Sequence, residues 1–72
     1  MKKAEIGLNA GKVWRLLSDN AKWKFEALKE KSGLNDRELS AALGWLARED
    51  KIEIHSEGDD LCVSLGVNVY IG

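Results

Sequence analysis

The sequence contains no proline, only one cysteine and only one histidine. Without a second cysteine, Cys62 cannot form an internal disulfide, so stability must come from packing or from self-association. No run of apolar residues approaches the ~20 that a membrane-spanning helix needs. Glu5 follows Lys2 and Lys3 closely and interrupts any export signal. A lone cysteine and no such signal predict a reducing, cytoplasmic environment.

Repeats, linkers and low-complexity tracts are also missing. A chain of 72 residues accommodates one domain and leaves no room for a second. We therefore expect a single domain over residues 1–72, with its core over about residues 5–65. Residues 66–72 are expected to form a C-terminal strand or tail.

Charge is unevenly distributed along the chain, although the net charge is only −1. Residues 1–34 carry eight Lys or Arg and four Asp or Glu, a balance of +4. Residues 35–72 carry three basic and eight acidic residues, a balance of −5. A surface built from the second half is therefore expected to be acidic.

Apolar spacing predicts two helices in the first half of the chain. The first is expected to begin at Asn9, whose side chain can cap the first turn, and to end at residues 18–20. A short strand over residues 23–25 follows. A second helix over residues 26–31 is expected to bury an alanine and a leucine and to end at Gly33 in a left-handed conformation. These two apolar residues are Ala27 and Leu28.

A third helix is predicted after Asn35, which has a capping-box partner in Glu38. It is expected to end near Glu49 or Asp50. Its apolar residues recur at steps of three and four, as on one face of a helix. They are Leu39, Ala42, Leu43 and Leu46.

The apolar period then becomes two, which indicates a β-hairpin. Gly58 as the first residue of a two-residue turn fits type II′. A turn centred there pairs Ile54 with Val63 and Ile52 with Leu65, so that inward residues face inward residues. The inward set is Ile52, Ile54, Leu61, Val63 and Leu65, with Cys62 and Ser64 on the opposite face.

Helix, short strand, helix, tight turn, helix and hairpin is the element order of a winged helix domain. A helix-turn-helix with a glycine in its turn forms the middle of it. The sequence thus predicts an α+β winged helix-turn-helix fold. It has three helices and a C-terminal β wing of two or three strands.

Two stretches resemble a known family. Residues 9–14 read Asn-Ala-Gly-Lys-Val-Trp, and residues 42–52 contain Gly44-Trp45 inside a helix, which is unusual. Together they are similar to a family of small prokaryotic winged helix-turn-helix domains whose function is not known. The likeness covers roughly residues 5–65. It implies a winged helix fold and a DNA-binding ancestry, and it implies no catalytic residue.

DNA binding is the function that this fold suggests first. In typical winged helix proteins the third helix enters the major groove and the wing contacts the backbone. The candidate contacts are Arg37, Ser40 and Arg48 on the third helix, or Lys12 and Arg15 on a basic face of the first two helices. The wing, however, is acidic and has no basic residue between Ile52 and Leu65. Such a surface would repel phosphates, so DNA binding is the alternative rather than the preferred function.

Protein contact is the preferred function. Trp45 lies ~100° from the apolar stripe of its helix, and Gly44 beside it allows a second backbone to approach. Trp45 either forms an interface or packs on the base of the wing. An apolar tail can pair with a sheet edge, so we also predict a homodimer. The candidate tail residues are Val67, Val69 and Ile71.

An enzyme is not expected. His55 faces Cys62 across the predicted hairpin on its half-exposed outer face, but two ligands are too few for a metal site. The acidic residues at the wing tip lack the spacing of a calcium loop. The sequence carries no phosphate loop, nucleophile elbow or dinucleotide fingerprint. We therefore predict no catalytic residue, no metal and no cofactor.

Overall fold

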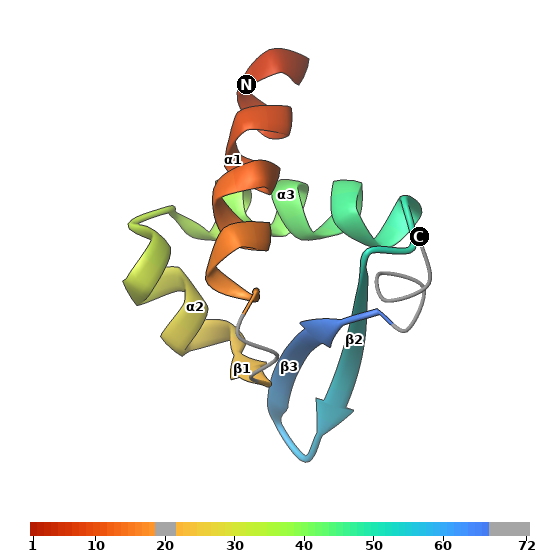
Figure 1. Ribbon diagram of the computed structural model, residues 1–72. Helices are drawn as coiled ribbons and strands as arrows, with labels where there is room; N and C mark the ends of the chain where they lie inside the picture. Colours follow the sequence, from red (N-terminus) through yellow and green to blue (C-terminus); the bar gives the residue numbers. More distant parts are fainter. Residues whose placement is uncertain (19–21, 67–72) are drawn as a thin grey trace.

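The structure, a computed structural model, describes residues 1–18 and 22–66. Three helices and three strands make up this part of the chain (Figure 1). They are α1 (Lys3–Leu16), β1 (Trp23–Lys24), α2 (Phe25–Ser32), α3 (Asp36–Arg48), β2 (Ile52–Glu57) and β3 (Asp60–Leu65). The predicted α+β winged helix-turn-helix order is confirmed.

The sheet is antiparallel, with strand order β1-β3-β2. β2 and β3 form the wing, in which Ile54 pairs with Val63 and Ile52 with Leu65, as predicted. Gly58 has φ +63°, and no other turn residue has a positive φ, which fits the predicted type II′ turn. β1 adds the third strand by placing Trp23 opposite Val63.

The first helix begins at Lys3, so the predicted start at Asn9 is wrong. Ile6 lies one turn before the buried Ala10 and is itself partly buried, so the apolar face continues toward the N-terminus. Asn9 is an interior helix residue, and Lys2 occupies the N-cap position without a side-chain hydrogen bond. Asn9 is a residue type that often caps helices, but here it does not mark the start of one, because the apolar helical pattern continues on both sides of it.

The turn between α2 and α3 follows the prediction closely. Gly33 has φ +75° and ends α2 in the left-handed region. The Asn35 side chain accepts from the backbone N–H of Glu38 (2.8 Å), and the Glu38 carboxylate accepts from the N–H of Asn35 (3.0 Å). In α2, Leu28 is buried as expected, but Ala27 is exposed. This short helix buries only one stripe, which Leu28 shares with Ser32 four residues on.

The connection from α3 to the wing is tightly hydrogen-bonded. The N–H of Lys51 donates to the carbonyl of Leu46 (3.0 Å), and that of Asp50 donates to the carbonyl of Ala47 (3.1 Å). This is a Schellman motif with Asp50, at φ +59°, in the position that glycine usually fills. Gly66 packs against the same connection, because a Cβ there would lie 2.8 Å from the Asp50 carbonyl oxygen.

The core lies between α1, α3 and the base of the wing. Its residues include Val13, Leu17, Leu28, Leu39, Leu43, Leu46, Ile52 and Val63. The wing extends beyond the helices (Figure 1), so Ile54 and Leu61 near its tip stay 41% and 39% exposed. Both lie on the face that was predicted to point inward, and near the tip this face is only partly buried. No helix in the described part of the chain is long and apolar enough to cross a membrane.

Candidate interaction surface

One face of α3 carries four of the residues singled out from the sequence. Arg37, Ser40, Gly44 and Arg48 recur at steps of three and four, and all are exposed. They lie opposite the buried stripe of Leu39 and Leu46, so the structure brings them onto one outer face. Among the described residues, neither arginine of this face forms an ion pair.

Lys12 and Arg15 lie elsewhere, on the exposed side of α1. α1 and α3 pack through their buried faces, so their outer faces point in different directions. The structure therefore does not join Lys12 and Arg15 to the outer face of α3. Arg15 is folded along its own helix, where its Nε donates to the carbonyl of Gly11 (3.3 Å).

Two of the wing's acidic residues have basic partners from β1 and the residue before it. Glu57 forms an ion pair with Lys22, and Asp60 pairs with Lys24 at 3.3 Å. The hydrogen bond from Lys22 lowers the pKa of the Glu57 carboxyl, and the bond to Glu57 raises the pKa of Lys22. The wing is thus less acidic than its sequence suggests. Sequence reasoning missed these lysines because 35 residues separate Lys22 from Glu57.

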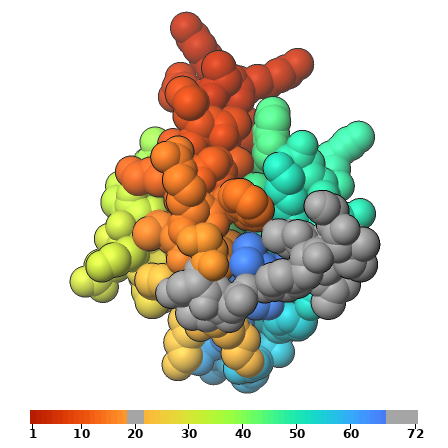
Figure 2. Space-filling model, in the orientation of Figure 1, coloured from red at the N-terminus to blue at the C-terminus, as the bar shows by residue number. Residues whose placement is uncertain are grey.

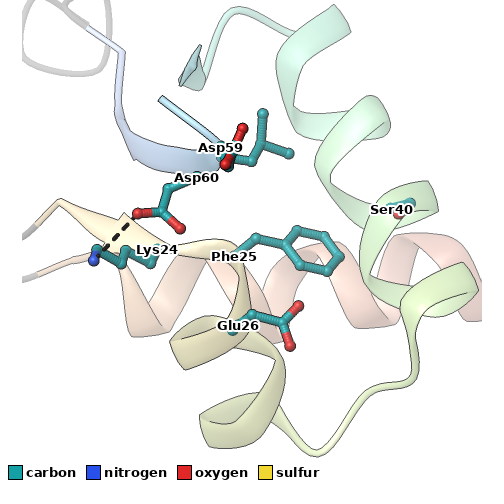
Figure 3. A pocket seen from close by; sticks show the side chains of 7 residues that line it. Lys24, Phe25, Glu26, Ser40, Asp59 and Asp60 are labelled. Carbon is teal, nitrogen blue, oxygen red and sulfur yellow. Dashed lines mark ion pairs between the residues drawn. The ribbon is translucent and has the colours of Figure 1, made fainter. Parts of the chain in front are cut away.

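A groove of about 330 Å³ lies between the wing tip, the start of α2 and α3. Figure 3 shows the Phe25 ring between Asp59 of the wing and Glu26 of α2. Leu61 adds a second apolar side chain. Neither Asp59 nor Glu26 forms an ion pair with another described residue. The groove therefore combines an apolar floor with an acidic rim. Its lining residues are Lys24, Phe25, Glu26, Ser40, Asp59, Asp60 and Leu61.

Trp45 packs on α1. A Cβ added at Gly7 would lie 3.7 Å from Cζ2 of Trp45, and Trp45 as a residue remains 40% exposed. Gly44 has open space around it, since a Cβ there would meet nothing within 4 Å. The predicted interface residues of the tail, Val67, Val69 and Ile71, lie outside the described residues.

His55 faces Cys62 across the wing, as the register predicted. The thiol, however, is buried rather than half-exposed. Cys62 lies on β3, which is the central strand of the sheet. Its Sγ is 3.8 Å from the carboxylate of Glu57, the same carboxylate that pairs with Lys22. No group of three potential metal-ligating side chains occurs within residues 1–18 and 22–66.

Here α2 and α3 form a helix-turn-helix, and the outer face of α3 lies beside a β-hairpin. This arrangement defines a winged helix-turn-helix domain. This chain belongs to the winged helix-turn-helix domain family DUF2582, whose model matches residues 1–65. The resemblance seen in the sequence is thereby confirmed.

Relatives occur in archaea and bacteria. The chain is 44% identical over 50 residues to the uncharacterized protein MJ1608 of Methanocaldococcus jannaschii, a match that covers 67% of this chain and 71% of the relative. The solution structure of protein BT2368 from Bacteroides thetaiotaomicron has a TM-score of 0.80 and 34% identity, covering 90% of this chain and 79% of the other.

The same fold occurs in a transcription regulator. The crystal structure of the PcaV transcriptional regulator from Streptomyces coelicolor, in complex with its natural ligand, has a TM-score of 0.74 at 12% identity. The match covers 99% of this chain and 49% of that chain. At this identity the likeness concerns the fold alone.

Proposed function

We propose that this domain is a non-catalytic protein-interaction module. Its partner is a protein segment that places one apolar side chain, flanked by Lys or Arg, in the groove between the wing and α3. The observation that carries the proposal is the groove itself, which is lined by the apolar side chains of Phe25 and Leu61 and by the acidic side chains of Glu26 and Asp59. We expect this contact to occur in the cytoplasm, as the lone cysteine predicts.

The charges of the groove favour a cationic partner over a phosphate backbone. Among the described residues that line it, Lys24 alone is basic, and it already pairs with Asp60. Glu26 and Asp59 form no ion pair with another described residue, although Lys29 lies near enough to Glu26 to interact with its charge, so a Lys or Arg of the bound segment would meet a negative field. A DNA backbone at the same place would be repelled.

The size of the groove favours a single anchoring side chain. A volume of about 330 Å³ is at the lower limit of ligand pockets, and this one is open to solvent. Burial of an apolar side chain contributes about 1.5–3 kcal/mol at most, before the cost of ordering the segment. We therefore expect a transient, micromolar contact rather than a permanent complex.

DNA binding is a second candidate because one observation favours it. Arg37 and Arg48 lie on the outer face of α3 without ion pairs among the described residues, where winged helix proteins contact DNA. The shared fold with a transcriptional regulator supports the same candidate. The acidic rim beside Ser40 opposes it, and for that reason we place it second.

Selection of a random peptide library on the immobilised protein tests the proposal. We expect enrichment of sequences with Leu, Ile or Phe flanked by Lys or Arg. The enrichment should be lost on Leu61→Ser and on the double variant Glu26→Lys/Asp59→Lys, because both alter exposed groove residues. Glu30→Lys makes one charge reversal of the same kind on α2, outside this groove, and is the control.

The expected pattern is a basic-apolar consensus that survives Glu30→Lys and disappears with both groove variants. Circular dichroism establishes that each variant folds. A library that yields no consensus, or a consensus that binds the groove variants as well as the native protein, would contradict the proposal.

A further inference from the structure

The outer face of α1 has an apolar residue that nothing in the described structure covers. Leu8 is 75% exposed, more than Met1, Trp45, Ile54 or Leu61. Figure 2 shows the N-terminal half of α1 standing clear of the body of the molecule. Leu8 points away from the core, because the buried residues Ala10 and Val13 lie on the opposite side of the helix.

Gly11 lies on the same face as Leu8, and no contact with the described residues requires a glycine there. A Cβ there would meet only the tip of Arg15, 3.9 Å away, and its φ is not positive. Glycine inside a helix is unfavourable relative to alanine. A glycine on an exposed helix face allows the close approach of a second backbone.

We propose that α1 packs antiparallel against α1 of a second copy of this chain, with Leu8 of each copy seated on Gly11 of the other. Residues 4, 8, 11 and 15 repeat at steps of four and three, the spacing of the contact positions of a two-helix coiled coil. A protruding leucine and an open glycine on one face make that face complementary to itself, as a two-fold dimer requires.

The flanking charges support this register. Glu5 and Lys12 lie on the same edge of the face, two turns apart, and both are exposed. With Leu8 on Gly11, Glu5 of one copy lies beside Lys12 of the second copy, and the two-fold axis repeats the pair. The proposal is independent of the groove, which lies between the wing and α3.

The dimer is expected to be weak. Two helices of 14 residues bury less surface than a standard interface of about 1,600 Å². We expect a dissociation constant on the order of 100 µM, so that association is visible only at high protein concentration.

Charge exchange between residues 5 and 12 tests the proposal by sedimentation velocity from about 10 µM to 1 mM. Glu5→Lys alone and Lys12→Glu alone each place like charges together, and each should weaken the dimer at least tenfold. The double variant Glu5→Lys/Lys12→Glu should restore it. An equimolar mixture of the two single variants should also dimerise, because each then meets its opposite charge. Leu8→Ala should weaken the dimer without a change in thermal stability.

The control exchanges the same charges on α2. Glu30→Lys and Lys31→Glu, both exposed, should each dimerise as the native chain does, alone and mixed. A native chain that stays monomeric at 1 mM overturns the proposal. So does a dimer that is unaffected by the single variants at positions 5, 8 and 12, since it would use another surface. The proposal would also be overturned if each α2 variant alone failed to dimerise and a mixture of the two α2 variants restored the dimer.

Discussion

Asp50 carries a backbone conformation that favours glycine. Its φ of +59° is the only positive value at a non-glycine residue in the described part of the chain. Aspartate tolerates this region better than most residues but at some cost, whereas glycine adopts it freely. The residue thus joins α3 to the wing at the expense of a little stability.

We expect Asp50→Gly to raise the free energy of unfolding by about 0.5–1 kcal/mol, because it removes that cost and leaves the Schellman hydrogen bonds intact. Urea denaturation measures the difference. Glycine also gives the unfolded chain more freedom, which limits the gain. A loss of stability would show that the Asp50 side chain itself supports the connection.

Glu57 has a pKa below its ordinary value of 4.5, chiefly because Lys22 donates a hydrogen bond to its carboxylate. A lowered folded-state pKa means that the pair stabilises the fold above about pH 4.5 and that this contribution is lost as the pH falls through the folded pKa. Both side chains are half-exposed, so the effect on stability is small.

We expect an NMR titration of the Glu57 carboxyl carbon to show this lowered pKa, and Lys22→Gln to return it toward 4.5. Lys31→Gln, a change of an exposed lysine on α2, is the control and should leave it unchanged. An equal pKa of Glu57 in the native and Lys22→Gln proteins would mean that the pair does not form in solution.

At the scale of the element, α3 was the easiest to predict and α1 the hardest. The capping box and the buried stripe of α3 are local patterns, and both hold in the structure. The predicted start of α1 is wrong because asparagine is a common N-cap residue, whereas the apolar face of this helix continues on the N-terminal side of Asn9. Alternation predicts that Ile54 and Leu61 face inward, but it does not show how far the helices cover that face of the wing.

Gly44 tests whether α3 is used as an interface at its centre. A Cβ there meets nothing within 4 Å, so we expect Gly44→Ala to stabilise the isolated protein by about 0.5–1 kcal/mol through helix propensity alone. The peptide selection described above should be unaffected, because Gly44 does not line the groove. If the Gly44→Ala protein were more stable but no longer enriched the peptide consensus, the interface would have to include the centre of α3.

At the scale of the whole molecule, the contrast between a basic first half and an acidic second half is partly cancelled by folding. Lys22, Lys24 and Lys29 of the first half pair with Glu57, Asp60 and Asp36 of the second. The sequence predicted an acidic wing, but these tertiary pairs and the groove depend on how distant segments meet. Local periodicity therefore gave the architecture, while the candidate site became visible only in three dimensions.

The central claim is that the face formed by α3 and the wing contacts protein rather than DNA. A titration of isotope-labelled protein with mixed-sequence duplex DNA, at about 20 mM and 150 mM salt, tests it most directly. We expect no chemical-shift changes on α3 or the wing at either salt concentration. Salt-sensitive shifts centred on Arg37, Ser40, Arg48 and the wing would contradict the account and establish the DNA-binding alternative.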